Sequence, residues 1–298
     1  AAREYKFPGR DPTHHILEVD GMRRKWIPVI SVLFVLIATT AFCGTADLAN
    51  ALVDAHKQGK LLPLVSAIDP KLDETGAYAV QRDYVTQRLK GDSVAGFKAG
   101  LTTAAGQKKF GVSGPVAGVL YGSGKMTGSP VIFSKGYAAL MVETELAFQA
   151  GRTITKPVKS VAELKRSFSS VMPSIELPDM NFKTMQGFRG VDLIAANVSA
   201  VSFIAGPKTR MGHRVDPNSF SVVLTRDGEK INAGKAPDAL GDQWKALLWL
   251  VNRSIESGWK IEAGDIFMTG ALGNMIPGKP GKYVADFGTL GKVMFEIR

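Results

Sequence analysis

The sequence predicts an α+β fold in which a mixed, β-rich body is flanked by helices. Two features predict it. From Val94 onward, short apolar runs alternate with Gly, Pro and Ser turns, and segments with apolar residues at helical spacing lie before and between these runs. The composition agrees, because 298 residues with 45% hydrophobic and 21% charged side chains are typical of a globular protein and exclude a disordered, collagen-like or coiled-coil chain.

Two helices are predicted before the β-rich part. Residues 47–59 (DLANALVDAHKQG) have apolar residues at helical spacing, with Asp47 as the expected N-cap and Gly59 as the expected end. Residues 73–90 (DETGAYAVQRDYVTQRLK) have the same character, and Asp73 is the expected cap. These helices are expected to pack outside the β-rich body.

Two further helices are predicted later in the chain. Residues 160–171 (SVAELKRSFSSV) begin with Ser160 as cap and have Glu163 at the capping-box position. Residues 237–257 (PDALGDQWKALLWLVNRSIES) form the longest predicted helix, which Gly258 ends.

The predicted strands are short apolar runs bounded by turn residues. They are VAGFKAGL (94–101), GVL (118–120), SPVIF (129–133), ALMVETELAF (139–148), DIFMTGAL (265–272) and KVMFEIR (292–298). The sequence contains no internal repeat and no low-complexity linker, so residues 47–298 are expected to form a single domain.

Residues 22–46 match the pattern of a secretory signal. Three basic residues follow Met22, residues 26–42 carry no charge and are mostly apolar, and Gly44 and Ala46 place small side chains at −3 and −1 for cleavage after Ala46. We therefore expect a cleaved leader and an exported, periplasmic protein. A buried helix and an uncleaved membrane anchor are the alternatives, and a cytoplasmic location stays open.

Residues 1–21 then precede the expected natural start. Export signals begin at an initiator Met, so this stretch is interpreted as upstream translated sequence or as a remnant of the expression vector, and it is left out of the fold prediction.

The charge and cysteine content narrow the classes of partner. Lys and Arg number 37 against 27 Asp and Glu, a net charge of +10, which favours anionic small molecules or surfaces. No basic run is interleaved with aromatic residues, so nucleic acid is not an expected partner. One cysteine excludes an internal disulfide framework and a cysteine-based zinc site within one chain.

The most informative stretch for chemistry is MVETELAF, residues 141–148. Side chains alternate along a strand, so Glu143 and Glu145 share one face with Cα atoms roughly 6–7 Å apart. Two carboxylates on one face repel unless water or a cation such as Mg²⁺ or Mn²⁺ separates them. The alternative is a solvent-facing polar strand face, which is the commoner setting of an isolated Glu-x-Glu.

Two more residues add to this candidate site. Glu176 lies in the apolar, Pro-bounded run PSIELPD, where a glutamate is expected to have a partner. Lys98 lies within the small, apolar run VAGFKAGLT, where it is either an edge-strand lysine or a buried group that binds a carboxylate or moves a proton. The sequence contains no paired-histidine zinc pattern, no Gly-x-Ser-x-Gly and no Walker-type loop.

Seven stretches occur in a familiar order along residues 47–298. They are FKAGLT, GVLYGSGKM, VETELAF, PSIELPD, AANVSAVSFIAG, LLWLVN and AGDIFMTGALG. Together they resemble the 2-keto-4-pentenoate hydratase family, which includes 2-oxohept-4-ene-dioate hydratases and 4-oxalocrotonate decarboxylases within the wider fumarylacetoacetate hydrolase fold. The resemblance implies a single catalytic domain over 47–298, with a β-rich body of the fumarylacetoacetate hydrolase C-terminal-domain type. It also implies a homo-oligomer and a role in the catabolism of aromatic compounds.

The resemblance also implies a set of site residues. Glu143, Glu145 and Glu176 would bind Mg²⁺ or Mn²⁺, and Lys98 would lie beside the metal as a catalytic and substrate-binding group. Thr269 and Ser199 would bind substrate, although Thr269 is equally well interpreted as a strand-end residue.

The implied substrate is a small anionic 2-keto acid in its 2-hydroxy-dienoate form. The cation polarises the 2-oxo group, and water adds at C4 to give a 4-hydroxy-2-keto acid.

Two positions depart from the family pattern. The hydratases usually carry Asp in a P-D-F-G stretch, where this chain has Val116, and Asp in a D-N-A-S stretch, where it has Ala196. Loss of a proton-relay acid favours a 4-oxalocrotonate-type decarboxylase, which needs no activated water. A non-catalytic metal and keto-acid binding protein is the third interpretation. Restoring the acid with Val116→Asp is expected to raise hydratase activity.

Overall fold

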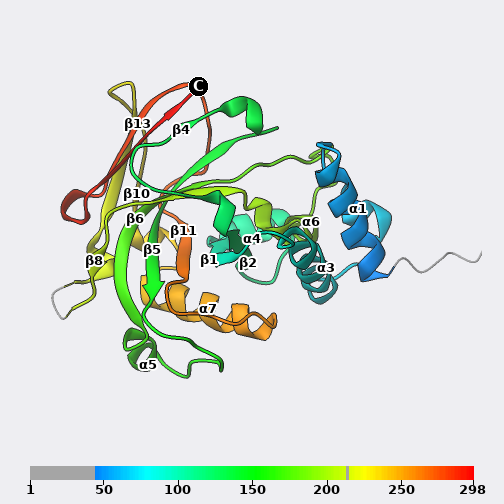
Figure 1. Ribbon diagram of the computed structural model, residues 1–298, viewed down its shortest axis with the longest axis horizontal. Coiled ribbons are helices and arrows are strands. Elements are labelled where there is room, and N and C mark those ends of the chain that lie inside the picture. Colours follow the sequence, from blue (N-terminus) through cyan, green and yellow to red (C-terminus); the bar gives the residue numbers. More distant parts are fainter. Residues whose placement is uncertain (1–43, 213–214) are drawn as a thin grey trace, which may run out of the picture. The chain divides into compact units, whose positions relative to one another are not determined.

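The computed structural model describes residues 44–212 and 215–298, which form two β-sheets with helices packed around them (Figure 1). The α-helices are α1 (Thr45–Lys57), α2 (Val65–Ile68), α3 (Glu74–Arg88), α4 (Ala104–Phe110), α5 (Val161–Lys165), α6 (Gly190–Ala195) and α7 (Gln243–Glu256). Short 3-10 turns are η1 (Gly122–Gly124), η2 (Ser134–Gly136), η3 (Asn197–Ser199), η4 (Pro217–Ser219), η5 (Ala236–Asp238) and η6 (Gly288–Leu290). This is the α+β arrangement that the sequence predicts.

The larger sheet is mixed. Its strands run in the order β2-β1-β11-β5-β6-β7-β3, with β12 paired to β5 and β8 to β6. β1 is parallel to β11, whereas β11, β5 and β6 pair antiparallel. The bounds are β1 (Val94–Gly100), β2 (Val116–Tyr121), β3 (Lys125–Met126), β5 (Met141–Ala150), β6 (Phe168–Leu177), β7 (Ser202–Ala205), β8 (Thr209–Arg210), β11 (Ile266–Ala271) and β12 (Ile276–Pro277).

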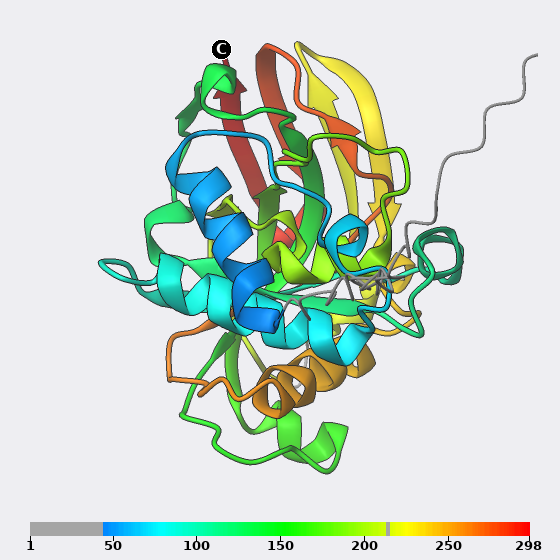
Figure 2. The same cartoon turned by 90° about the vertical axis from the view of Figure 1, so that its right-hand side faces the viewer.

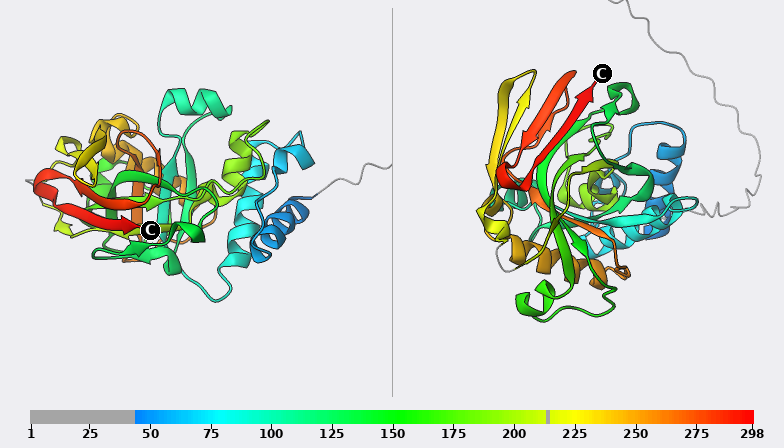
Figure 3. Two further views of the ribbon diagram at one scale, coloured as in Figure 1. Left: turned by 90° about the horizontal axis from the view of Figure 1, so that it is seen from above. Right: turned by 60° about the vertical axis from the view of Figure 1, so that its left-hand side comes forward.

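The second sheet combines four strands from the last third of the chain with the earlier β4, in the order β10-β9-β13-β14-β4 (Figure 3). Its strands are β4 (Val131–Ile132), β9 (Ser221–Arg226), β10 (Glu229–Lys235), β13 (Gly281–Asp286) and β14 (Lys292–Ile297). The β9–β10 hairpin turns at Asp227-Gly228, both with positive φ (53° and 90°), which suits the twist of a two-residue hairpin.

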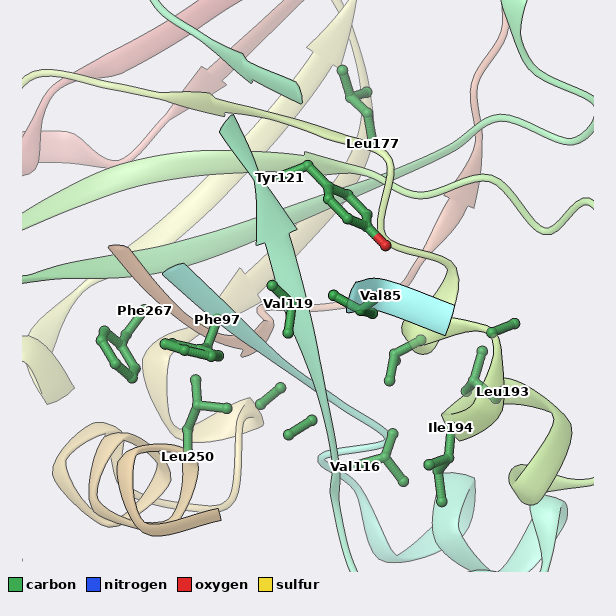
Figure 4. Packing of buried hydrophobic residues seen from close by; sticks show 14 of the residues in the cluster. Val85, Phe97, Val116, Val119, Tyr121, Leu177, Leu193, Ile194, Leu250 and Phe267 are labelled. Carbon is green, nitrogen blue, oxygen red and sulfur yellow. The ribbon is translucent and has the colours of Figure 1, made fainter. Parts of the chain in front are cut away.

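Buried aromatic and aliphatic side chains join the larger sheet to the helices. Phe97 of β1 and Phe267 of β11 have ring centroids 5.2 Å apart, and Leu250 of α7 lies beside them (Figure 4). α7 packs across β11, β1 and β2, while α1 packs on α3 and α3 on α6 (Figure 2). Burial of each such side chain stabilises the fold by about 1.5–3 kcal/mol.

The first predicted helices are confirmed, with one changed cap. α3 begins after Asp73, whose carboxylate accepts a hydrogen bond from Gly76 N at 2.7 Å. α1 begins two residues before the predicted Asp47. Gly44 is the N-cap, and the Asp47 carboxylate accepts from Gly44 N at 3.1 Å, so Asp47 caps the helix from inside its first turn.

The two later helices are shorter than predicted. The helix expected over 160–171 ends at Lys165, because Phe168 and Val171 are buried in β6, and their pairing with β5 outweighs local helix propensity. The helix expected over 237–257 begins only at Gln243. Leu240 and Gly241 before it are left-handed (φ 54° and 75°), which breaks the helix there.

The expected leader and upstream stretch lie outside the described residues as far as position 43. The cleavage point predicted after Ala46 falls within the first turn of α1. Across residues 44–212 and 215–298, none of the helices combines the length and the apolar character that crossing a bilayer requires.

Candidate active site

Strand register brings the three predicted carboxylates together. Glu143 on β5 lies directly opposite Glu176 on β6, and Glu145 opposite Ser174. Side chains two apart on a strand share a face, so all three glutamates point to the same side of the sheet. One oxygen from each lies within 4.8 Å of the others.

Lys98 reaches this cluster from β1. Its Nζ lies 3.0 Å from Glu176 Oε1, although β11 and β5 separate the two strands in the sheet order. Three strand spacings would amount to about 14 Å in a flat sheet, so the sheet must curl to allow this ion pair. The register of β11 against β5 shifts between Met268 and Ala271, next to the site.

The cluster is buried and short of hydrogen-bond donors. Glu145 and Glu176 are fully buried and Lys98 is 3% exposed, while Glu143 is half-buried. Gly270 N donates to Glu145 Oε2 at 2.7 Å. Glu145 Oε1 and Glu176 Oε2 have no hydrogen-bond partner, a costly arrangement for buried oxygens unless something else coordinates them.

The pKa values of the cluster also indicate that its carboxylates lack enough positive charge around them. Burial, and then the charge of Glu176, raise the pKa of Glu143 to about 8, and the same causes raise the pKa of Glu145 well above its ordinary value. Burial alone would lower the pKa of Lys98, but the three carboxylates outweigh it and raise that pKa. One ammonium group cannot neutralise three carboxylates. The donor set therefore fits a hard divalent cation, which takes oxygen ligands and leaves positions for substrate.

Two of the sequence-based alternatives are wrong. The Glu-x-Glu face does not meet solvent, because Glu145 is fully buried. Lys98 is not an edge-strand lysine, because β1 lies between β2 and β11.

A cavity of about 370 Å³ opens onto Lys98 and Glu143. Most of its wall is apolar, and the apolar side chains include Leu101, Phe110, Met180, Leu193, Val198 and Met275. Such a wall suits a short hydrocarbon chain whose polar head lies at the charged end.

The structure separates the other two predicted site residues. Ser199 lines the cavity, and its hydroxyl donates to Met180 Sδ at 3.3 Å. Thr269 is fully buried and does not line it. The Thr269 hydroxyl lies 2.6 Å from Gln243 Oε1, to which it donates, and 3.2 Å from Leu146 O. This geometry favours the structural interpretation of Thr269.

Sequence reasoning missed the residue that positions Ser199. Asn197, Val198 and Ser199 all have positive φ (56°, 52° and 56°), a strained conformation for side-chain-bearing residues. The buried Asn197 amide holds this turn against β2, because its Oδ1 accepts from Val119 N at 2.7 Å and its Nδ2 donates to Val119 O at 2.9 Å. The asparagine in AANVS was visible in the sequence, but its partner was not.

Comparison with known proteins decides the family. No protein-family model matches the chain. A 2-keto-4-pentenoate hydratase from Burkholderia vietnamiensis is 30% identical over 250 residues, which cover 83% of this chain and 95% of that protein. The chain belongs to the 2-keto-4-pentenoate hydratase family.

Solved structures support the fold of this family member. The 4-oxalocrotonate decarboxylase from Pseudomonas putida G7, complexed with magnesium and adipate, matches with a TM-score of 0.78 at 24% identity, over 85% of this chain and 97% of that one. A fumarylpyruvate hydrolase from Pseudomonas aeruginosa, in complex with Mn²⁺ and pyruvate, matches with a TM-score of 0.53 at 12% identity, over 67% and 88%. The predicted fumarylacetoacetate hydrolase-type fold is confirmed.

Val116, one of the two departures from the expected family pattern, lies on β2 next to the strand that carries Lys98. Val116 is fully buried and pairs with Gly100 across β1 and β2. A methyl group on Gly100 would lie 2.8 Å from Val198 Cγ1 and 3.3 Å from Val116 Cγ2, so both valines pack closely against this glycine. Where the family resemblance led us to expect an acid, this chain has a closely packed apolar wall.

Proposed function

We propose that the protein is a divalent-metal-dependent hydro-lyase that adds water to 2-hydroxy-2,4-dienoates of the 2-keto-4-pentenoate type. The observation that carries this proposal is the buried cluster of Glu143, Glu145 and Glu176, paired with Lys98 at one end of an apolar cavity. Family membership supports a lyase of this kind, because curated relatives over most of the chain include 2-keto-4-pentenoate hydratases and a 4-oxalocrotonate decarboxylase.

The three glutamates would hold Mg²⁺ or Mn²⁺. Structural relatives were solved with these two ions, which supports a divalent cation here. When bound, the cation supplies a Lewis acid that polarises the 2-oxo group and stabilises enolate charge.

Lys98 is the proposed proton carrier. As an ammonium group 3.0 Å from Glu176, it can donate to the 2-oxygen of the substrate and carry a proton between the 2-hydroxyl and C5. Protonation at C5 gives the enone, to which water adds a hydroxyl at C4 and a proton at C3. The carboxylates around Lys98 raise its pKa. Neutralising their charge is therefore expected to lower the pKa of Lys98 toward a value suited to proton transfer.

The cavity wall would hold the carbon skeleton. Its apolar side chains exclude bulk water from the diene, and Ser199 offers a hydroxyl next to the cavity. The net positive charge of the chain favours approach of an anionic substrate.

A 4-oxalocrotonate-type decarboxylase is the second candidate, and Val116 favours it. Loss of CO₂ needs the same stabilised enolate but no group that activates water. The apolar packing of Val116 and Val198 on Gly100 provides no such group at that position.

One assay separates the two candidates. The protein with Mg²⁺ or Mn²⁺ is given 2-hydroxypenta-2,4-dienoate or 4-oxalocrotonate, and dienoate absorbance and CO₂ release are followed together. Loss of absorbance with a 4-hydroxy-2-keto acid product and no CO₂ supports the hydratase. Release of CO₂ assigns the decarboxylase, and no turnover of either substrate contradicts both.

Export and assembly are further parts of the proposal. The pattern of residues 22–46 supports an exported, periplasmic protein, and cleavage after Ala46 would leave Asp47 as the first residue of α1. Sequencing the mature N-terminus tests this. Resemblance to the family supports a homo-oligomer, which light scattering after gel filtration tests.

A further inference from the structure

A second cavity, of about 380 Å³, lies behind the wall of the catalytic one. It is formed where the carboxyl ends of α1 and α3 meet η2 and the segment that follows η3. Among residues 44–212 and 215–298, Ser199 alone lines both cavities. Nothing in the proposed reaction uses this space.

Its charged lining is mostly basic. His56, Lys60, Arg88 and Lys135 line it, against a single acid, Asp179. The Asp179 carboxylate already accepts hydrogen bonds from Ala138 N at 3.1 Å and Ala139 N at 2.6 Å, so much of its charge is stabilised by backbone amides.

The permanent cations have no acidic partner. In residues 44–212 and 215–298, no carboxylate forms an ion pair with Lys60, Arg88 or Lys135. The Arg88 guanidinium is held over the Tyr121 ring, 4.3 Å from its centroid, and its Nη1 donates to the Tyr84 hydroxyl at 3.5 Å. These contacts limit its motion and leave its other N–H groups for a ligand. Burial and the nearby Arg88 lower the pKa of His56, so near neutral pH its ring offers hydrogen bonds rather than charge.

Helix dipoles explain only part of this arrangement. Basic residues are favoured in the last turn of a helix, which accounts for His56 in α1 and Arg88 in α3. Lys60 lies beyond the end of α1 and Lys135 lies in η2, far away in sequence. Three cations from separate segments around one cavity are better explained by a ligand of opposite charge.

We propose that this second cavity binds a small organic anion through a carboxylate or phosphate group held by Arg88, Lys60 and Lys135. The volume suits a molecule of metabolite size, and Asn181 adds an amide to the lining. Guanidinium and ammonium groups together recognise both carboxylate and phosphate oxygens. The binding does not depend on the proposed reaction.

Titration calorimetry tests the site with two probes, succinate and inorganic phosphate, at constant ionic strength and without divalent metal. Saturable binding of either probe is expected, and the stronger one identifies the ligand as carboxylate or phosphate. Lys135→Gln and Arg88→Gln should each weaken binding about fivefold or more, the usual effect of losing a charge-assisted contact. Lys135 is exposed, so its variant is expected to fold even if loss of the Arg88–Tyr121 stack destabilises the other.

Two matched variants locate the binding. Lys57→Gln removes an exposed charge from the last turn of α1, outside the cavity, and should leave affinity unchanged. Glu143→Gln alters the catalytic cluster and should also leave it unchanged. Absence of saturable binding, equal loss in Lys57→Gln and Lys135→Gln, or loss in Glu143→Gln would each overturn the proposal. These readouts need no turnover, so they are independent of the proposed function.

Discussion

Glu143 and Glu176 lie directly opposite each other on β5 and β6, and the ammonium group of Lys98 lies 3.0 Å from Glu176 Oε1. Like charges in this position destabilise a sheet. Burial and the charge of Glu176 together raise the pKa of Glu143 to about 8. The metal-free fold therefore favours the protonated forms of Glu143 and Glu145, and a bound divalent cation would favour their ionised forms instead.

The metal-free protein is expected to lose stability as pH rises from about 4.5 to 8. Glu143 and Glu145 have folded-state pKa values above their unfolded ones, so in this window the folded state holds protons that the unfolded state has lost. The pKa of Lys98 is also raised. The stability that its charged form contributes is therefore lost only at a pH above the ordinary pKa of lysine, which lies outside this window. Melting temperatures measured with EDTA should fall as pH rises through this window, and melting temperatures measured with Mg²⁺ should not. Parallel curves would contradict this charge assignment.

Lys98→Met is expected to abolish most activity while retaining the metal. Removal of the proton carrier should lower kcat/KM by about 10²–10⁴-fold. Removal of its positive charge beside Glu176 should leave Mn²⁺ affinity equal or higher, because the carboxylates lose their competing cation. Calorimetry and the dienoate assay check both effects. Unchanged kcat/KM would exclude a catalytic role, and lost metal affinity would indicate a structural one.

Thr269→Val is expected to reduce stability rather than substrate affinity. The hydroxyl donates to the buried Gln243 Oε1, and leaving that oxygen unpaired costs about 1–3 kcal/mol. The KM should stay close to that of the wild type, since Thr269 does not line the cavity. Chemical denaturation and steady-state kinetics distinguish the two effects. A large rise in KM at unchanged stability would restore the substrate-binding interpretation.

The effect of Val116→Asp is expected to depend on Val198. A lone aspartate at this fully buried position would lie against Val198 across Gly100 and cost about 2 kcal/mol or more. Val116→Asp combined with Val198→Ala makes room for the acid and its hydration. The double variant should raise water addition relative to CO₂ release, and Val198→Ala alone is the control. An unchanged product ratio would mean that this position does not set the reaction.

The sequence indicated which charged residues come together better than it predicted the bounds of the helices around them. Alternation within β5 places Glu143 and Glu145 on one face, and this needs only the strand itself. Glu176 could be assigned through the family resemblance, but its position opposite Glu143 depends on strand register. The approach of Lys98 depends on the curl of a sheet in which two strands intervene, and spacing along the chain carries no such information.

Features that the sequence did not reveal have a common physical cause. Residues 168–171 have helical spacing, yet pairing with β5 makes them a strand. The sequence left Thr269 open between a substrate contact and a structural role, and the hydrogen bond of its hydroxyl to Gln243 of α7 favours the structural one. The second cavity joins α1, α3 and η2, whose cations are scattered along the chain. In each case tertiary contacts outweigh the local pattern.

The most direct test of the metal centre is anomalous scattering from crystals grown with Mn²⁺. The account predicts one strong peak about 2.0–2.3 Å from carboxylate oxygens of Glu143, Glu145 and Glu176, near Lys98 Nζ but not bonded to it. Absence of a peak at saturating Mn²⁺, or a peak held by other residues, would contradict the assignment of these glutamates and the metal-dependent chemistry built on it.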